Sequence, residues 1–365
     1  MTQKQEVSGT RLYFFADGLA LACWVARIPE IQGALHLSDR GVGLALLGMA
    51  VGALAANTLS VKWAERSGLG VVARVSSLCL SAALLLPGLA WSGASLFVAL
   101  AILGLGSGCL NVAQNALAAG LERRAQRPMM VSFHALYSAG GLVGALLGAG
   151  AAAVHLPPLV HFALAAGILS VVLYRVHPIH IDEPTIETSN GAASSWLPIL
   201  CLMAFCTVLS EGAMGDWSGI YLTTVLHKSA ATGALGYAAF SLCMVLGRCF
   251  GDRLSLFFGQ VRLLRGGALL AAAGLGATLL GWLPGAELAG FACIGFGCAA
   301  TYPLLARAAG TARAIAMLSS IGFLGSLCGP SLIGMLSGPV GLGRALGLVV
   351  VANLVVAWQA HVVER

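Results

Sequence analysis

The chain has 365 residues, of which 58% are hydrophobic and only 9% are charged, and its mean hydropathy is +0.90. Soluble globular domains carry about 25% charged residues, so this composition excludes that class and indicates a protein that lies mostly in lipid. The formal net charge of +6 is better explained by membrane orientation than by nucleic-acid binding.

Apolar segments follow one another along the whole chain. Each reaches the ~20 residues that an α-helix needs to cross a hydrocarbon core of ~30 Å, and none alternates as barrel strands do. The sequence therefore predicts an all-α integral membrane protein with twelve transmembrane helices. Their approximate bounds are 12–34, 41–63, 71–90, 94–119, 131–154, 157–175, 197–222, 231–256, 264–283, 286–306, 313–336 and 340–361.

Basic residues are distributed unevenly between the two ends of these helices. If the N-terminus is cytoplasmic, sixteen of the 20 lysines and arginines lie at inner ends and loops, Arg248 among them. The outer side keeps only Arg27, Arg40, Lys228 and Arg344. Cytoplasmic loops of membrane proteins are enriched in Lys and Arg, so this bias predicts cytoplasmic N- and C-termini and an even number of spans.

A polar stretch divides the chain into two halves. Residues 176–195, VHPIHIDEPTIETSNGAASS, are expected to form a cytoplasmic linker between six-helix bundles at 1–175 and 196–365. The halves echo each other, because Ser138, Gly141, Gly144 and Gly148 have the same spacing as Ser319, Gly322, Gly325 and Gly329. Two such pseudo-symmetric bundles are typical of transporters, with a substrate site near the midplane between the halves.

Glycines of the fifth span repeat at helical spacing. Gly140, Gly144 and Gly148 form two successive GxxxG steps, which let a neighbouring helix approach backbone to backbone. Close packing explains any single step. Recurrence of the pattern in both halves favours helices that also slide or rock against each other.

The first span carries three charged groups. Asp17 lies ~9 Å beyond Arg11 along the helix, inside the inner half of the span. An acid in the bilayer costs at least ~2.5 kcal/mol and usually faces a cavity or a partner, so Asp17 is a candidate for proton coupling. The alternatives are an interhelical hydrogen bond or a side chain that snorkels to the inner surface. Arg27 and Glu30 lie ~24 and ~29 Å beyond Arg11, where a surface pair is favoured over a gate.

Polar side chains of the fourth and fifth spans complete a candidate cavity. Asn111, Gln114 and Asn115 occupy positions i, i+3 and i+4, so they share one helix face and can bond a hydroxylated solute or a neighbouring helix. His134 and Tyr137, near the inner end of the fifth span, are candidates for the same cavity, although a structural role is favoured for both.

The seventh span offers a second acidic pair in SEGAMGDWSGIY. Glu211 lies ~22 Å from the inner boundary and is the second candidate for proton coupling, with a paired structural acid as the alternative. Asp216 lies nearer the outer end, where binding Arg27 would close an outer gate. Trp24 and Trp217 have the apolar surface to stack on a sugar ring, but tryptophan at the outer interface is the favoured interpretation.

Several motifs together resemble a known family. A short basic second-to-third loop, SVKWAERSG, and its counterpart GRCFGDRL are similar to the signature loops of the major facilitator superfamily. Glu65, Arg66 and Gly68 fit its acid-base-x-glycine order, whereas Asp252 and Arg253 fit only the first half. The resemblance implies a cytoplasmic latch at Asp252.

Three longer motifs resemble a narrower group. WVARIPEIQGAL, LNVAQNALAAGLERRAQRPMMVSFHALYSAGGLVGALLGA and SEGAMGDWSGIYL are similar to the YbjJ-like bacterial inner-membrane branch, a distant relative of fucose permease type sugar/proton symporters. The resemblance spans essentially the whole chain. It also implies acids that this chain lacks: Asn111 and Val25 stand where the fucose permease type has them. Asp17 is the obvious replacement.

No enzyme motif occurs. The sequence has no Walker loop, HExxH, zinc-spaced cysteines or GxSxG turn, so we expect neither catalysis, nor a metal, nor a cofactor. We expect a monomeric, proton-coupled secondary transporter of the bacterial inner membrane that moves a sugar or another small polar solute by alternating access. Two alternatives remain, a proton-driven exporter of amphipathic compounds and a transporter-like membrane sensor.

Overall fold

The computed structural model describes residues 3–126, 129–176, 179, 196–282, 285–309 and 312–364. These residues form helices and connecting turns, with no strand among them. The chain divides into two compact units, residues 1–185 and 186–365. The predicted linker at 176–195 lies almost entirely outside the described residues.

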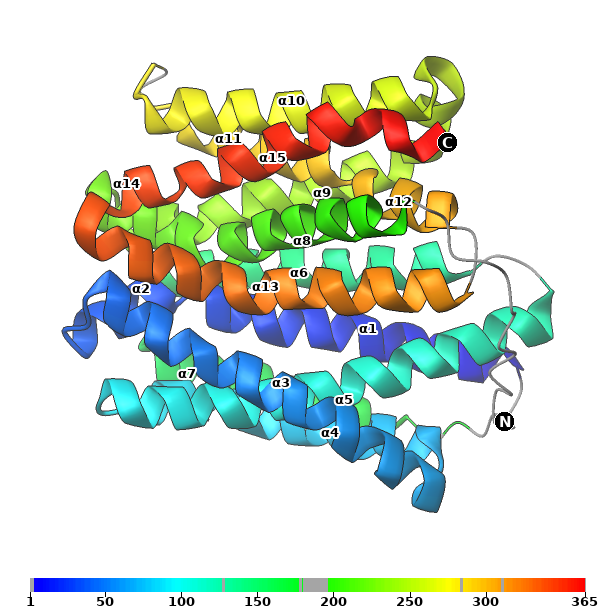
Figure 1. Cartoon of the computed structure of the whole chain (residues 1–365). Helices are drawn as coiled ribbons and strands as arrows, with labels where there is room; N and C mark the ends of the chain where they lie inside the picture. Colours follow the sequence, from blue (N-terminus) through cyan, green and yellow to red (C-terminus); the bar gives the residue numbers. More distant parts are fainter. Residues whose placement is uncertain are drawn as a thin grey trace. The chain divides into compact units, whose positions relative to one another are not determined.

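The described residues of the N-terminal unit form eight helical elements. Its elements are α1 (Gln3–Val25), α2 (Ile28–Ala34), α3 (Asp39–Ser67), α4 (Leu69–Ala83), η1 (Leu86–Leu89), α5 (Gly93–Ala125), α6 (Met130–Ala153) and α7 (Pro158–Tyr174). Helix α1 packs mainly on α6, α3 packs on α5, and α4 packs on α5 and α7 (Figure 1).

The C-terminal unit repeats this plan. Its elements are α8 (Leu197–Ile220), η2 (Tyr221–Val225), α9 (Ala230–Phe258), α10 (Gln260–Leu279), α11 (Glu287–Cys298), α12 (Thr301–Ala309), α13 (Ala312–Val340), α14 (Leu342–Ala345), α15 (Gly347–Gln359) and η3 (Ala360–Glu364). Helix α8 packs mainly on α13, α9 on α11, and α10 on α11 and α15 (Figure 1).

These elements confirm the predicted all-α fold with twelve membrane helices. Within the described residues, ten helical segments are long and apolar enough to cross a membrane. The shorter apolar helix α7 and the 20-residue α10 complete the twelve. Large apolar side chains such as Leu164, Ile168 and Val351 are more than half exposed, as expected of surfaces that face lipid.

A proline explains the interruption of two of the predicted spans. The first span breaks at Ala26 and Arg27, between α1 and α2. Pro29 has no N–H, and its ring clashes with the carbonyl of the residue four positions earlier, which is the last residue of α1. Pro303 has the same relation to Ala299, where the tenth span breaks between α11 and α12.

Glycines bring the principal helix pairs into backbone contact. A methyl group on Gly140 would overlap the Phe15 carbonyl oxygen of α1, and one on Gly18 would overlap the Tyr137 carbonyl oxygen of α6. In the C-terminal unit, Gly325 of α13 approaches the Phe205 carbonyl of α8 in the same way. The close packing predicted from the glycine spacing is therefore present in both halves, whereas sliding of these helices stays a prediction.

The same one-residue turn follows the second span of each half. Gly68 separates α3 from α4 with φ +80°, and Gly259 separates α9 from α10 with φ +79°. Glycine adopts this left-handed region without the steric cost that a side chain would bring. The halves thus share this turn even though the signature residues before it differ.

Candidate functional site

Asp17 lies in the middle of α1, enclosed by two donors from α5. It is 1% exposed. The Ser107 hydroxyl donates to Oδ1 at 2.8 Å, and Nε2 of Gln114 donates to Oδ2 at 3.0 Å. Ser107 and Gln114 are two turns apart on one face of α5. The structure therefore joins two predicted residues, Asp17 and Gln114. It adds Ser107, which the sequence analysis did not select because a serine between glycines does not stand out as a functional residue.

The donors around Asp17 are all neutral. None of the ion pairs formed by the described residues includes it. Two acceptor oxygens that each receive one hydrogen bond suit an ionised carboxylate. A proton on Oδ1 would require only that the Ser107 hydroxyl turn to accept, whereas a proton on Oδ2 would require the buried Gln114 amide to turn over. Oδ1 is therefore the oxygen that can gain a proton with the smaller rearrangement.

The polar residues of α5 do not act as one group. Gln114 is fully buried against Asp17, while Asn111 is exposed. Asn115 is half-buried, and its Nδ2 donates to the Asn111 backbone carbonyl at 2.8 Å. The shared face predicted for the three residues is thus divided between an internal contact and a more exposed edge.

His134 and Tyr137 lie beside an apolar cluster at one end of α6. The His134 ring meets Phe14 edge-on, with centroids 5.2 Å apart. Tyr137 packs against the cluster that this Phe14 belongs to. Both rings are half-buried, and their role in solute binding stays a prediction. The buried members of the cluster are Phe14, Ala118, Leu121, Met129 and Phe133.

Arg27 and Glu30 form an ion pair, but it does not lie on the surface. Arg27 is 0% exposed, and its Nη2 donates to Glu30 Oε1 at 2.9 Å and also to the Leu156 carbonyl oxygen. The preference for a surface pair was wrong, because the break before α2 turns Arg27 inward against the loop that follows α6. Both the gating role of the pair and the pairing of Arg27 with Asp216 stay predictions.

Both candidate tryptophans are buried. Trp24 is 1% and Trp217 0% exposed. The Trp217 indole N–H donates to the Pro330 carbonyl oxygen in α13 at 3.0 Å. Interface tryptophans expose much of the ring to headgroups, so the belt interpretation was wrong for both. Stacking on a solute stays a prediction.

Glu211 has a charged neighbour in α9. Its Oε2 lies 3.7 Å from Nη2 of Arg248, and the two side chains are 25% and 20% exposed. Arg248 lies about 15 Å before the end of α9 at Phe258, and its predicted place at a cytoplasmic helix end stays a prediction. An arginine within an apolar span indicates a functional site, so the sequence alone could have pointed to Arg248.

Further polar groups surround this pair. Tyr237 of α9 lies within electrostatic range of Glu211, Asp216 and Arg248, with Ser241 in hydrogen-bonding reach of its hydroxyl. Asp216 is half-buried, more than one turn beyond Glu211. The C-terminal unit therefore holds two carboxylates and a guanidinium within electrostatic range of one tyrosine.

A neutral network lies next to Glu211. Nδ2 of Asn353 in α15 donates to the Ser210 hydroxyl at 3.0 Å, and the Cys298 thiol donates to Asn353 Oδ1 at 3.4 Å. All three residues are buried. This network ties α8 to α15 and α11, and so fixes the helix that carries Glu211.

Sequence comparison assigns these helices to a family, because the Major Facilitator Superfamily profile matches residues 12–310. The chain belongs to the major facilitator superfamily. A transporter of this type from Yersinia pestis is 33% identical over 99% of this chain and 96% of its own length. Membrane protein MosC from Rhizobium meliloti is 29% identical over 100% of this chain and 91% of its own length.

Solved facilitator structures share the fold. A bacterial homologue of the human lysosomal transporter Spinster, inward-facing and occupied, matches with a TM-score of 0.72 at 16% identity, over 98% of this chain and 95% of its own. A variant of the nucleoside transporter NupG matches with a TM-score of 0.73 at 11% identity, over 99% and 100%. Membership of this family supports membrane transport as the function, while the YbjJ-like branch and the likeness to fucose permease stay predictions.

The facilitator signature loop is present in the first half. Glu65 and Arg66 lie exposed in the last turn of α3, directly before the Gly68 turn. Arg253 is exposed in α9, and the Asp252 side chain lies outside the described residues. The latch and gating roles of these four residues stay predictions.

Proposed function

We propose that this facilitator is a proton-coupled secondary active transporter that moves a small polar, sugar-like solute across the bacterial inner membrane by alternating access. Asp17 and Glu211 carry the proton coupling. The observation behind the proposal is the Asp17 site, a carboxylate 1% exposed within a membrane bundle whose hydrogen-bond partners among the described residues are the neutral Ser107 and Gln114.

The energetics of this site support proton exchange. An ionised carboxylate away from water is costly unless it is paired or fully hydrogen-bonded. Asp17 has two hydrogen bonds and no ion pair among the described residues. Neutralisation by a proton on Oδ1 keeps both contacts, because the Ser107 hydroxyl can accept as well as donate. The site can therefore hold either protonation state with little movement.

The C-terminal unit supplies polar groups suited to a solute. Glu211 and Arg248 are each about a quarter exposed or less and lie 3.7 Å apart, so a carboxylate that can accept and a guanidinium that can donate hydrogen bonds lie together on this unit. Asn111 and Asn115 of α5 add amides that can donate and accept bonds to hydroxyl groups. Such mixed donors and acceptors favour a hydroxylated solute over an amphipathic drug-like compound, which would need an apolar pocket.

Two further features of the proposal come from the sequence. The excess of Lys and Arg at one set of helix ends supports cytoplasmic N- and C-termini. The resemblance to the YbjJ-like branch supports a bacterial inner-membrane location, and membership of the superfamily supports a monomeric protein.

Proton movement in proteoliposomes tests the proposal. Wild type, Asp17→Asn and Glu211→Gln are loaded with an internal pH dye and presented with pools of sugars, sugar acids, nucleosides and lipophilic cations. We expect one polar pool to drive proton flux in wild type and either substitution to abolish it. Glu364→Gln, which removes an acid from the end of η3, serves as the control and should retain the flux.

The other outcomes identify the alternatives. Proton flux driven only by lipophilic cations would establish an exporter of amphipathic compounds. Thermal stabilisation by one pool without any flux would establish a sensor. Solute uptake that persists without proton flux in both acid variants would show that Asp17 and Glu211 do not couple transport to protons.

A further inference from the structure

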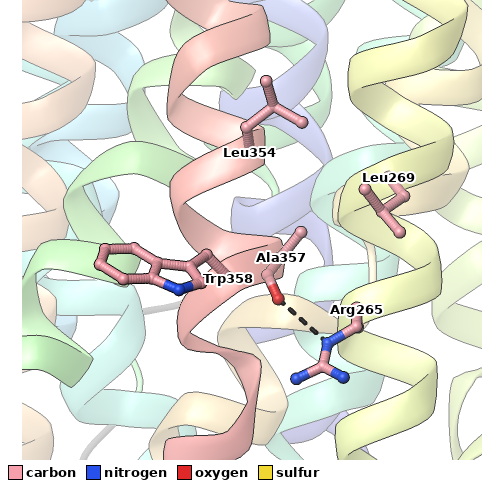
Figure 2. Close-up of a pocket in the computed structure, with 5 residues that line it drawn as sticks. All are labelled: Arg265, Leu269, Leu354, Ala357 and Trp358. Carbon is pink, nitrogen blue, oxygen red and sulfur yellow. Dashed lines mark hydrogen bonds between the residues drawn. The ribbon is translucent and has the colours of Figure 1, made fainter.

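A shallow groove lies on the outside of the C-terminal unit, between α10 and α15. Its volume is about 300 Å³, and it is lined by Arg265, Leu269, Leu354, Ala357 and Trp358 (Figure 2). Three of these are large exposed apolar side chains: Leu269 and Leu354 are 47% and Trp358 is 73% exposed. The groove is thus an open apolar surface with one cationic group.

The Arg265 guanidinium is held in a fixed orientation. Its Nε donates to the Ala357 carbonyl oxygen at 3.2 Å. Figure 2 shows the two terminal nitrogens pointing away from that carbonyl. A guanidinium anchored through Nε presents its remaining N–H groups as a planar fork, the geometry that matches phosphate oxygens.

The polar and apolar parts of the groove follow one another along the helices. Arg265 lies about 8 Å from the start of α10, near one end of this helix. Leu269 follows one turn further into the span, and Leu354 lies one turn further in on α15. A charged end near the membrane surface and an apolar floor toward its centre match a phospholipid lying along the groove.

The N-terminal unit has a groove at the equivalent place. Nη2 of Arg74 in α4 donates to the Tyr174 carbonyl oxygen at 2.9 Å, as Arg265 bonds Ala357 in the other half. The Arg74 guanidinium also lies 5.2 Å from the centroid of the Tyr174 ring, which is 67% exposed. A groove of about 450 Å³ beside it is lined by Ser170, Val171, Tyr174 and Arg175.

Neither groove carries an opposing acid. The helices at the two grooves, α4, α7, α10 and α15, contain no Asp or Glu, and arginines lie on α4 and α10. We infer that the two grooves are binding sites for anionic phospholipids of the surrounding leaflet, with the lipid phosphate on Arg265 in one half and on Arg74 in the other. The acyl chain lies on Leu269 and Leu354 in the first site. Basic pockets between membrane helices bind such headgroups in general.

Lipid selectivity of the purified full-length protein tests this inference. The protein is equilibrated in detergent with equal amounts of phosphatidylglycerol and phosphatidylethanolamine, and the retained lipids are quantified by mass spectrometry. Wild type should retain phosphatidylglycerol preferentially. Arg265→Gln should lower that preference about fivefold, the effect of one basic group near a membrane surface.

Three matched variants separate binding from structure. Arg265→Lys keeps the charge but loses the Nε contact, so it should retain most of the preference. Arg262→Gln removes an exposed charge from the same helix outside the groove and should change the preference less than about twofold. Arg74→Gln should cause a second, separate loss. Equal selectivity in wild type and Arg265→Gln, or an equal loss in Arg262→Gln, would overturn the inference.

Salt provides a test that needs no variant. Raising the ionic strength from about 0.01 M to about 1 M shortens the Debye length from about 30 Å to about 3 Å. The wild-type preference for phosphatidylglycerol should fall across this range because exposed guanidinium–phosphate contacts are screened. A preference that does not change with salt would contradict headgroup binding.

Discussion

The first helix of each half carries an acid near its middle, and the two acids have opposite surroundings. Asp17 in α1 is 1% exposed and is bonded by the neutral Ser107 and Gln114. Glu211 in α8 is 25% exposed and lies 3.7 Å from a cation, Arg248. One duplicated fold has therefore produced a closed neutral site in one half and an open charged site in the other.

A shift of one residue explains much of this difference. Aligning Trp24 with Trp217 places Asp17 opposite Ser210, so Glu211 lies one position further along its helix. One residue turns a side chain by about 100° around the helix axis. Ser210 accordingly meets Asn353 of α15, whereas Glu211 meets Arg248 of α9.

The helix that packs beside each acid differs as well, because the second half lacks an equivalent of the Gln114 donor. Aligning Gly104 with Gly295 places Ser107 opposite Cys298 and Gln114 opposite Leu305. Leu305 is fully buried and cannot donate a hydrogen bond. An acid at Ser210 would therefore lack the amide that Asp17 has, and this explains why the acid of this half lies toward α9.

We expect the largest difference in stability between the two halves at the glycine that follows each acid. Gly18→Ala places a methyl group on the Tyr137 carbonyl of α6. We expect it to lower the free energy of unfolding by about 3 kcal/mol, because backbone cannot yield as a side chain can. The added methyl of Gly212→Ala would meet Ser326 at 3.3 Å, so a shift of a few tenths of an ångström suffices and the cost should stay below about 1 kcal/mol.

Unfolding in mixed detergent and SDS micelles measures both values. Gly150→Ala is the control for helix propensity, because nothing lies within 4 Å of its added methyl. Equal losses in the Gly18 and Gly212 variants would show that the two acids are not held by different packing.

Much of the fold could be predicted from the sequence, because twelve apolar segments of sufficient length leave few alternatives in a membrane. The two helix breaks were also within reach, since each lies within the four residues before a proline, Pro29 or Pro303. They were missed because hydropathy alone does not change at these prolines.

The candidate site was only partly predictable. Asp17 and Gln114 each stood out as polar residues in apolar spans, but no pattern showed that they meet. Ser107 was hidden because a serine among glycines usually indicates close packing. Arg248 was missed because it stands beside the basic residues of a predicted loop, and only the length of α9 shows how deep it lies.

Removing the donor at the closed site should have an intermediate effect. Gln114→Leu keeps the side-chain volume similar but removes the bond to Asp17 Oδ2. Hydrogen bonds to charged groups contribute about 1.5–3 kcal/mol, so we expect a loss of about 2 kcal/mol in unfolding free energy. The same substitution at Asn115, which bonds only its own helix, should cost less than about 1 kcal/mol.

Adding Asp17→Asn to the Gln114 variant sharpens this result. The double variant has no carboxylate to leave unpaired, so most of the loss should be recovered. A loss that remains in the double variant would mean that Gln114 stabilises the bundle by packing alone.

Arg248→Gln should give the smallest change in stability. Its contact with Glu211 is long and both side chains reach solvent, and exposed ion pairs contribute about 0.2–1 kcal/mol. We therefore expect a loss below about 1 kcal/mol in unfolding free energy, decreasing further at high salt because the pair is screened. The loss at Gln114 should not change with salt, because the Asp17 site is closed to solvent.

In a transport assay, by contrast, we expect Arg248→Gln to have a large effect. If Arg248 holds the Glu211 carboxylate for solute or proton exchange, Arg248→Gln should abolish transport while leaving the protein nearly as stable as wild type. Arg248→Lys keeps the charge and should restore part of the activity. A large, salt-independent loss of stability in Arg248→Gln would contradict the comparison, because the pair would then behave as a buried structural contact like the one around Asp17.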